Sequence, residues 1–318
     1  MSKKPVLLSG IKPTGDLHIG NYFGAMRQQV ELFKSGKYQC FIMVADYHAL
    51  NTMQNAEEMH RRTKELVMAY IAIGLDPKDV VLFKQSDVPE HTELAWIFDT
   101  ITTMPYLMRA HAYKDAVAKN KEINVGTFNY PMLMAADILI YDTSIVPVGA
   151  DQKQHIEIAR DTAQKFNHIF KNDLFTLPKP YIMPDVATVP GIDGKKMSKS
   201  YGNVIPLFSS REELTKRVMS IVTDSSGERP ENVYKIHKLV RSEQELDSIY
   251  SEHKGKYKEL KDILADDLNN YLEPMRGRYN KIESEHEIIN DILKSGAEKA
   301  RAVTKEKIRL VKQAIGVL

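Results

Sequence analysis

Short runs of consecutive apolar residues alternate with helix-length segments over the first 84 residues. The apolar runs are 6–10, 39–46 and 80–83, and the segments with helical spacing between them are 22–33 and 55–73. The second helical segment ends before Gly74, a residue type common at helix C-termini. Strands that are apolar on both faces are typical of a parallel sheet covered by helices on both sides. The pattern therefore predicts a doubly wound α/β sheet of βαβαβ order, with ligands at the carboxyl ends of its strands.

The rest of the chain predicts one more strand and many helices. Residues 87–143 have helical character interrupted at Pro89, Pro105 and Pro131, 145–149 resemble a strand end, 151–170 form a helix, and 178–194 form a loop rich in proline, glycine and aspartate. Beyond residue 209 only amphipathic helical stretches occur, at 211–222, 231–240, 255–275 and 297–314. We therefore expect a second, all-helical domain at the C-terminal end.

Composition limits the class of protein. With 318 residues, 43% of them hydrophobic, the chain can bury a sizeable core. Its net charge of +2 neither indicates nor excludes a polyanionic partner. The single cysteine, Cys40, permits no internal disulfide, and no stretch approaches the roughly 20 apolar residues of a membrane span. We expect a globular protein of the cytoplasm that does not enter a membrane.

Two loops contain candidate phosphate-binding residues. The first, 10–21, carries His18 and Gly20 and opens a helix, whose N-terminal amides favour anions. The second, 195–200, holds three lysines and two serines. Neither the GxxxxGK[ST] nor the GxGxxG pattern is present. Each loop alone more often forms a turn or a solvated basic segment, but together on one doubly wound sheet they favour a nucleotide site.

These loops resemble the signatures of the class I aminoacyl-tRNA synthetases. Residues 17–21 are similar to the first signature, and 196–200 match the second at all five positions. The resemblance implies a Rossmann-type catalytic domain that joins an amino acid to ATP as an enzyme-bound adenylate and then transfers it to tRNA. Asn21 stands where the first signature usually has histidine. The tryptophan enzymes of this class commonly carry that asparagine.

One helical segment suggests the amino acid. Met134 and Asp137 are three residues apart, on one face of a helix, and a carboxylate beside a thioether suits an indole, whose N–H is a donor. Spacing alone favours the simpler interpretation, in which Met134 is a core residue and Asp137 a helix-cap or paired carboxylate. Segments 130–139 and 146–157, however, resemble signature segments of bacterial tryptophanyl-tRNA synthetases.

That resemblance assigns roles to individual residues. It implies that Asp137 binds the indole N–H beside Met134, that Tyr130 and Gln152 hold the α-ammonium group, and that His48 lies near the amino acid. His18, Lys196 and Lys199 are implied as catalytic residues, the two lysines stabilising the pyrophosphate leaving group. The implied ATP-binding residues are Lys12, Pro13, Thr14, Gly20, Asn21, Gly149, Ala150, Asp151, Lys196, Met197, Ser198, Lys199 and Ser200. Lys12 replaces the glutamine often found there, Lys114 is a further candidate for the triphosphate, and Mg²⁺ is expected to accompany it.

The resemblance also implies a domain organisation. It assigns 1–204 to the catalytic domain with a dimer-interface insertion at about 85–145, 205–296 to an anticodon-binding domain, and 297–318 to a helix that packs back on the catalytic domain. The implied partners are L-tryptophan, ATP, tRNA(Trp) and a second copy of the chain. The apolar residues 94–98 fit an interface or a core helix equally well. A tyrosyl-tRNA synthetase and a non-catalytic, synthetase-like protein that binds adenylate or RNA are the alternatives.

Overall fold

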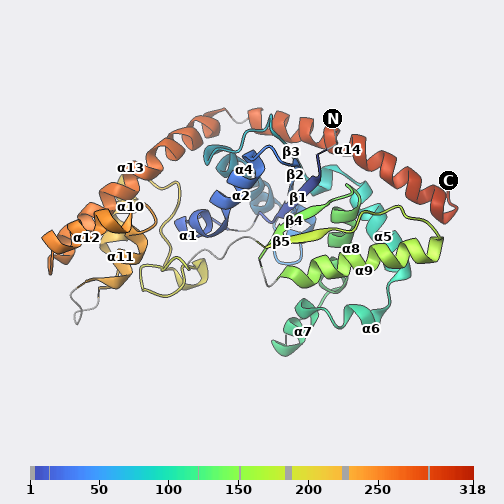
Figure 1. Ribbon diagram of the computed structural model, residues 1–318, viewed down its shortest axis with the longest axis horizontal. Helices are drawn as coiled ribbons and strands as arrows, with labels where there is room; N and C mark the ends of the chain where they lie inside the picture. The colour runs from blue at the N-terminus through green and yellow to red at the C-terminus, as the bar shows by residue number, and fades with distance from the viewer. Residues whose placement is uncertain are drawn as a thin grey trace.

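Within the residues that the computed structural model describes, five parallel strands form one sheet in the order β3-β2-β1-β4-β5 (Figure 1). The described residues are 4–13, 15–120, 122–149, 152–182, 188–223, 229–285 and 287–318. The strands are β1 (Val6–Ile11), β2 (Gln39–Val44), β3 (Val80–Lys84), β4 (Ile145–Val148) and β5 (Lys179–Ile182). The predicted doubly wound parallel sheet is confirmed. From β1 the sheet extends to β2 and β3 on one side and to β4 and β5 on the other. A crevice for ligands is therefore expected where the direction changes, at the carboxyl ends of β1 and β4.

The loop predicted over 178–194 is wrong for residues 179–182, which form β5. This strand pairs with β4 alone, in register from Ile145↔Lys179 to Val148↔Ile182. It lies at the edge of the sheet, and Tyr181 and Ile182 are exposed. An exposed edge strand that contains Pro180 lacks the continuous apolar run by which the buried strands were recognised.

Helices cover both faces of the sheet. One face carries α1 (Ile19–Asn21), a π-helical turn (Tyr22–Met26), α2 (Arg27–Lys34) and α4 (Ala56–Ala72); the other carries α5 (Glu90–Ile101), α8 (Val125–Leu139) and α9 (Lys153–Phe170). Leu7 and Ile42 pack on the first face, and Leu8 and Phe41 on the second. Alternate residues of each strand are thus buried in different cores, which explains the continuous apolar runs in the sequence.

Short elements connect these layers. They are α3 (Asp46–Ala49), a 3₁₀ turn (Gln85–Asp87), α6 (Met104–Leu107), α7 (His111–Ala118) and a 3₁₀ turn (Lys199–Tyr201). The expected interruption at Pro131 is wrong, because α8 continues through it. A proline inside a helix costs about 3 kcal/mol. Here most of the C-terminal half of α8 is buried, including Met132 and Ala135, and this packing holds the helix together.

The helical region packs directly on the first face of the sheet domain. It contains α10 (Arg211–Met219), α11 (Glu231–His237), α12 (Glu243–Glu252) and α13 (Tyr257–Ser284). The Arg278 guanidinium of α13 donates to the Ala72 carbonyl oxygen of α4 (2.6 Å), and the hydroxyls of Tyr22 and Tyr271 lie 3.2 Å apart. One apolar cluster runs from the sheet into this region. The all-helical C-terminal region is confirmed, whereas its boundaries at 204 and 296 remain predictions.

The last helix, α14 (Glu287–Ile315), begins ten residues before the expected start at 297. It runs along β3, the other edge of the sheet (Figure 1). Gly296 contacts the strand so closely that a Cβ there would overlap the Leu82 carbonyl oxygen and lie 2.6 Å from its carbon. Near the helix end, Lys307 Nζ donates to Asp142 (2.8 Å) and to the Leu174 carbonyl oxygen (2.8 Å).

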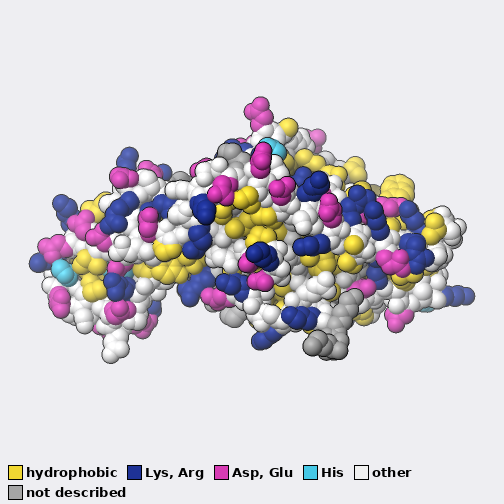
Figure 2. Space-filling model, turned by 90° about the horizontal axis from the view of Figure 1, so that it is seen from above, with side chains coloured by type: hydrophobic (Ala, Val, Ile, Leu, Met, Phe, Trp, Pro, Cys, Tyr) yellow, Lys and Arg dark blue, Asp and Glu magenta, His cyan; other side chains and the backbone are white. Residues whose placement is uncertain are grey.

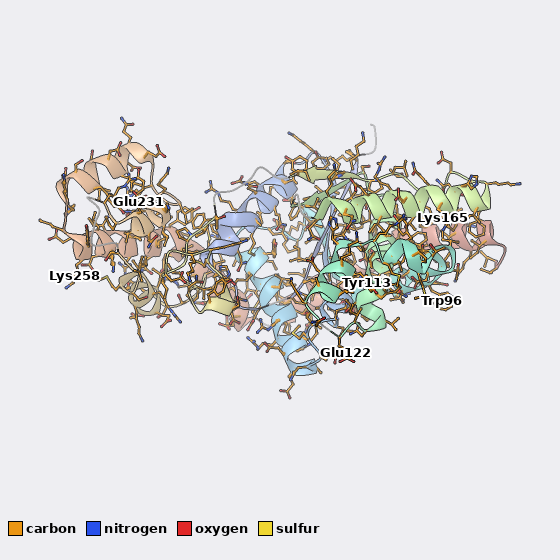
Figure 3. The ribbon with its side chains drawn as sticks, turned by 90° about the horizontal axis from the view of Figure 1, so that it is seen from below. Trp96, Tyr113, Glu122, Lys165, Glu231 and Lys258 are labelled. Carbon is orange, nitrogen blue, oxygen red and sulfur yellow. The ribbon has the colours of Figure 1, made fainter. Side chains whose placement is uncertain are left out.

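The surface is mixed in charge and carries some large apolar side chains. Basic and acidic side chains are interspersed over the face seen in Figure 2, in keeping with the net charge of +2. In α5, Leu94 and Phe98 are buried in the core, whereas Trp96 is 71% exposed and lies at the outer edge of the molecule in Figure 3. The apolar run 94–98 therefore has both a core side and a surface side. Among the described residues we find no helix whose length and apolar character would carry it across a lipid bilayer.

Gly296→Ala should destabilise the fold because the added methyl group has no room against the backbone of β3. We expect the free energy of unfolding to fall by about 2–3 kcal/mol, the scale of over-packing a tight contact. Gly277→Ala is the matched control, since a Cβ at this exposed position of α13 meets nothing within 4 Å. It should instead gain about 0.5–1 kcal/mol from the lower backbone entropy of alanine. Thermal and urea unfolding of both variants would measure the difference, and equal stabilities would contradict the close contact of α14 with β3.

Candidate active site

Backbone hydrogen bonds join the first predicted loop to the segment that follows the second. The Ile19 N–H donates to the Ile205 carbonyl oxygen (3.0 Å), and the Leu207 N–H donates to the Leu17 carbonyl oxygen (3.0 Å). His18 lies opposite Pro206 in this antiparallel bridge. The segment that follows residues 196–200 is thus fixed to the start of the helix at Ile19.

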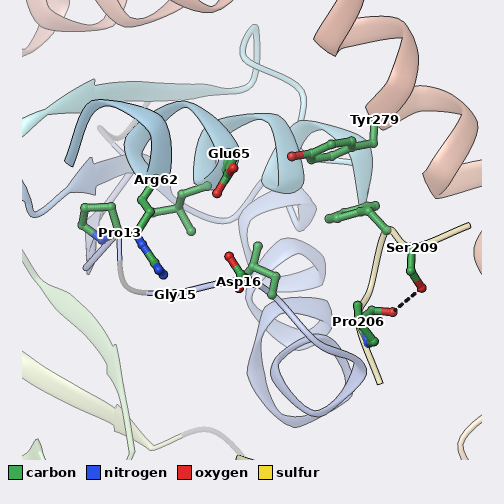
Figure 4. A pocket seen from close by; sticks show the side chains of 11 residues that line it. Pro13, Gly15, Asp16, Arg62, Glu65, Pro206, Ser209 and Tyr279 are labelled. Carbon is green, nitrogen blue, oxygen red and sulfur yellow. Dashed lines mark hydrogen bonds between the residues drawn. The ribbon is translucent and has the colours of Figure 1, made fainter. Parts of the chain in front are cut away.

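The loop after β1 also faces α4 and the helical region (Figure 4). Gly15, Asp16 and Arg62 of α4 line one small pocket, and the Arg62 guanidinium lies beside Gly15. The far wall is formed by Tyr279 of α13, whose ring stacks on Phe208 with centroids 4.2 Å apart. The sheet domain, residues 206–209 and the helical region therefore all lie beside this loop.

His18 is held as a neutral, buried imidazole. Its backbone N–H donates to the Asn21 side-chain oxygen (3.1 Å), so Asn21 caps the start of the helix. Burial, together with the positive charge of Lys199, lowers the pKa of His18 to about 4. Its Nδ1 is buried and has no hydrogen-bond partner among the described residues. At neutral pH the ring therefore offers polar atoms to a ligand at a helix N-terminus without carrying a charge.

Gly20 leaves room for a close approach between the two loops. A Cβ at this position would lie 2.9 Å from His18 Nδ1 and 3.2 Å from Met197 Sδ. Met197 itself is buried in the core below the loops. The central methionine of the second signature thus anchors its loop, while the first signature needs glycine to accommodate it.

Asn203 fixes the second loop, and sequence reasoning missed it. Its side-chain oxygen accepts from the Ser198 N–H (2.8 Å), and its amide donates to the Lys196 carbonyl oxygen (3.1 Å). The Lys199 ammonium lies against Gly15, in space that a Cβ there would fill, and burial lowers the pKa of Lys199. Lys196 and Ser200 remain exposed. The structure thereby brings Lys199 onto the first loop, with Lys196 on the same short segment.

A second cluster surrounds Asp137 on α8, which is 2% exposed. One carboxylate oxygen accepts from His48 Nε2 (2.8 Å), and the other accepts from His91 Nδ1 (2.5 Å). The Gln85 amide donates to both oxygens, at 2.8 and 2.9 Å. The far side of the His91 ring, Nε2, lies 2.7 Å from the Tyr141 hydroxyl.

This cluster keeps the carboxylate ionised. Burial alone would raise the pKa of Asp137, but the hydrogen bonds from His48 and His91 outweigh it and lower the pKa to about 2. The site is therefore a buried, anionic hydrogen-bond acceptor at neutral pH. Such a group suits a ligand that presents an N–H donor and little else that is polar.

Three members of this cluster were missed in the sequence analysis: Gln85, His91 and Tyr141. Gln85 carried a usable signal, because it is a polar residue that directly follows the buried strand β3. His91 and Tyr141 carried none, since His91 meets Asp137 and Tyr141 only in the folded chain, 46 and 50 residues away in sequence.

Tyr130 connects the Asp137 cluster to the loop after β1. Its hydroxyl lies 2.9 Å from His155 Nε2, and its ring meets that of His48 edge-on with centroids 6.1 Å apart. Lys12 Nζ lies 5.9 Å from the centre of the Tyr130 ring. A residue assigned to ATP and residues assigned to the amino acid are thus neighbours.

The other predicted site residues are placed as follows. Met134, also on α8, is partly buried against the core of the second face. Gln152 is the N-cap of α9, and its N–H donates to the Gly149 carbonyl oxygen (3.0 Å) at the end of β4. Pro13 is buried beside the first loop. Lys114 lies on α7, and its contact with the triphosphate remains a prediction.

Three predicted residues, Thr14, Ala150 and Asp151, lie outside the described residues. The described residues also contain no cluster of three histidine, cysteine, aspartate or glutamate side chains placed to hold a metal ion.

The chain is similar to known proteins over nearly its whole length. A family model described as tRNA synthetases class I (W and Y) matches residues 1–288. The tryptophan–tRNA ligase of Fusobacterium nucleatum is 44% identical over 319 residues, which cover 98% of this chain and 98% of the relative.

Solved structures agree with this result. The tryptophanyl-tRNA synthetase of Campylobacter jejuni, complexed with ADP and tryptophan, superposes with a TM-score of 0.90 at 42% identity, covering 98% of this chain and 99% of that one. The tryptophanyl-tRNA synthetase of Mycoplasma pneumoniae has a TM-score of 0.77 at 30% identity, covering 98% of both chains. The fold, the paired signature loops and these matches lead to one conclusion. The chain belongs to the class I tRNA synthetase family that contains the tryptophan and tyrosine enzymes.

Proposed function

We propose that this chain activates L-tryptophan with ATP and transfers it to tRNA(Trp). The observation that carries the proposal is the buried, ionised Asp137 carboxylate, which is connected through His48 and Tyr130 to Lys12 of the loop after β1. An indole ring has one N–H donor and no ring acceptor, so a single buried anionic acceptor can recognise it. Relatives 44% identical over 98% of the chain are tryptophan–tRNA ligases.

The first step joins the amino acid to the nucleotide. An oxygen of the tryptophan carboxylate bonds to the α-phosphorus of ATP, and the bond from that phosphorus to the bridging oxygen breaks. The electron pair leaves with pyrophosphate, and Lys196 and Lys199 neutralise its charge as it develops. His18 donates a hydrogen bond to a phosphate oxygen. Mg²⁺ enters with the triphosphate as part of the substrate, bound mainly by phosphate oxygens.

The second step transfers tryptophan to tRNA. The terminal ribose hydroxyl attacks the carbonyl carbon of the adenylate, and the bond from that carbon to the phosphate oxygen breaks. AMP leaves with the electron pair, and the hydroxyl proton passes to the solvent. The protein supplies position and charge in both steps and forms no covalent intermediate.

Tyrosine is the less suitable substrate for this pocket. A phenolic hydroxyl both donates and accepts hydrogen bonds, whereas ionised Asp137 can only accept, and Met134 beside it offers no strong donor. The non-catalytic alternative is disfavoured because His18, Lys196 and Lys199 are all present. The cytoplasm, where ATP and tRNA occur, is the compartment we propose, and the free, buried Cys40 thiol is compatible with it.

We further propose that the helical region α10–α13 binds the anticodon and that two copies of the chain form a homodimer through residues 85–145. Supporting the dimer, Trp96, Met104 and Val125 in this segment each expose well over half of their side-chain surface. Exposed large apolar side chains on one segment are typical of protein interfaces.

Exchange of labelled pyrophosphate into ATP tests the activation step. Exchange should depend on tryptophan and not on tyrosine. Asp137→Asn should lower tryptophan-dependent exchange about 100-fold, because the variant replaces an anionic acceptor with a neutral amide. Exchange with tyrosine would contradict the pocket assignment, and exchange with neither amino acid would contradict the catalytic function.

Lys199→Ala tests stabilisation of the leaving group. Removing a preorganised cation that acts on developing charge should lower kcat for exchange about 100- to 1,000-fold, with a much smaller change in KM for tryptophan. Lys165→Ala, at an exposed position on α9, serves as the control and should retain wild-type kcat. A loss confined to the KM for tryptophan would be inconsistent with the proposed role of Lys199.

Trp96→Glu tests the dimer. The substitution should shift the protein from dimer to monomer in light scattering at micromolar concentration, because it buries a charge in an apolar interface. Ile288→Glu, an exposed position outside 85–145, should leave the dimer intact. Trp96 is the chain's single tryptophan, so its fluorescence should shift to the red when the wild-type protein dissociates on dilution. A wild-type protein that is monomeric at all concentrations would disprove this arrangement.

A further inference from the structure

His91 and Tyr141 form a buried chain of hydrogen bonds that ends on Asp137. Asp137 Oδ1 lies 2.5 Å from His91 Nδ1, and Tyr141 Oη lies 2.7 Å from His91 Nε2. The His91 side chain has no exposed surface, and Tyr141 and Asp137 are each 2% exposed. None of the steps of adenylate formation or transfer uses His91 or Tyr141.

When the His91 ring is neutral, these hydrogen bonds allow only one proton arrangement. An ionised carboxylate can only accept, so His91 Nδ1 must carry the proton that is donated to Asp137. In a neutral ring Nε2 is then an acceptor, which the Tyr141 hydroxyl satisfies. Burial and the nearby charges of Asp137 and Glu90 raise the pKa of Tyr141 well above its ordinary value, so it remains a donor. Tyr141 thereby fixes His91 in the tautomer that donates to Asp137.

The arrangement also fixes the orientation of the Asp137 carboxylate. Three side chains make four hydrogen bonds to it: His48 and His91 each donate to one oxygen, and the Gln85 amide is shared between both. The χ2 torsion of aspartate is a broad, two-fold rotor with no strong preference of its own. Hydrogen bonds from different sides are therefore what holds the carboxylate plane in one orientation.

We propose that His91, fixed by Tyr141, is a positioning residue that orients the Asp137 carboxylate for the indole N–H and thereby sets the preference for tryptophan. The inference rests on the proposed function, in which Asp137 accepts this hydrogen bond. His91 does not touch the substrate and acts only through Asp137. Its loss should therefore affect the recognition of the indole N–H far more than the chemistry at phosphorus.

A substrate without the N–H separates positioning from general structural damage. In 3-(1-benzothiophen-3-yl)alanine a sulfur atom replaces the indole N–H, so the ring keeps its shape and loses its donor. We would measure kcat and KM in pyrophosphate exchange for tryptophan and for this isostere. The variants are His91→Leu, which removes the donor, His91→Asn, which keeps an N–H at the place of Nδ1, and Tyr141→Phe, which removes only the hydroxyl.

The wild-type protein should prefer tryptophan over the isostere. His91→Leu should raise the KM for tryptophan about 10- to 100-fold and leave the isostere nearly unchanged, so that the preference collapses by the same factor. Tyr141→Phe should change the preference in the same direction by a smaller factor, and His91→Asn should restore most of it. Exchange with the isostere reports directly that each variant is folded.

Two other outcomes are possible: one would contradict only the role of His91, and the other would also contradict the role of Asp137. If the His91 and Tyr141 variants lose activity equally with both substrates, or keep the wild-type preference while Asp137→Asn abolishes it, His91 has a structural role and this inference is wrong. If the wild-type protein itself shows no preference for tryptophan over the isostere, and Asp137→Asn changes nothing, the role of Asp137 in the proposed function fails as well.

Discussion

The buried charge of Asp137 is the constraint on which the arrangement of the site depends. Moving a carboxylate from water into a protein interior costs several kcal/mol unless donors replace the water. Here the donors come from three separate elements: His48 on α3 after β2, Gln85 after β3 and His91 on α5. The charge can be accommodated only when the carboxyl ends of these strands and helices α5 and α8 are all in place. The hydrogen bonds that hold Asp137, the residue proposed to recognise the indole, are therefore also contacts between elements packed on one face of the sheet.

The two signature loops, which are proposed to bind the nucleotide, are held in place by contacts of another kind. Backbone hydrogen bonds join Leu17 and Ile19 to residues 205–207, and Met197 is buried in the apolar cluster that also contains residues of α10, α11 and α13. The loop of the first signature, the loop of the second and the helical region are thus parts of one packed unit. A displacement of the linker at 205–207 would move the start of the helix at Ile19, since the two are joined by hydrogen bonds.

Much of the fold could be predicted because burial leaves a periodic pattern in the sequence. The strands β1, β2 and β3 are apolar on both faces, and the long helices show regular apolar spacing. The prediction failed where packing overrides the local pattern. At β5 one edge is unpaired and the side chains are exposed. At Pro131 the buried surface of α8 offsets the break that proline favours, and at residue 287 the helix begins before the region where its apolar spacing was recognised.

The sequence by itself determined which reactive side chains this protein carries and in which segments: a loop with His18 and Gly20, a lysine-bearing loop with Lys196 and Lys199, and a carboxylate on a helix at Asp137. Signature spacing reveals these residues because each is local in the chain. Only the tertiary structure decided how they act together. It placed Lys199 against the first loop, joined the Asn203 side chain to the second, and brought His91 to Asp137 across 46 residues and to Tyr141 across 50. The physical reason is that a hydrogen bond between residues distant in sequence leaves no periodic trace, because it depends on the relative positions of elements that only the packed core fixes.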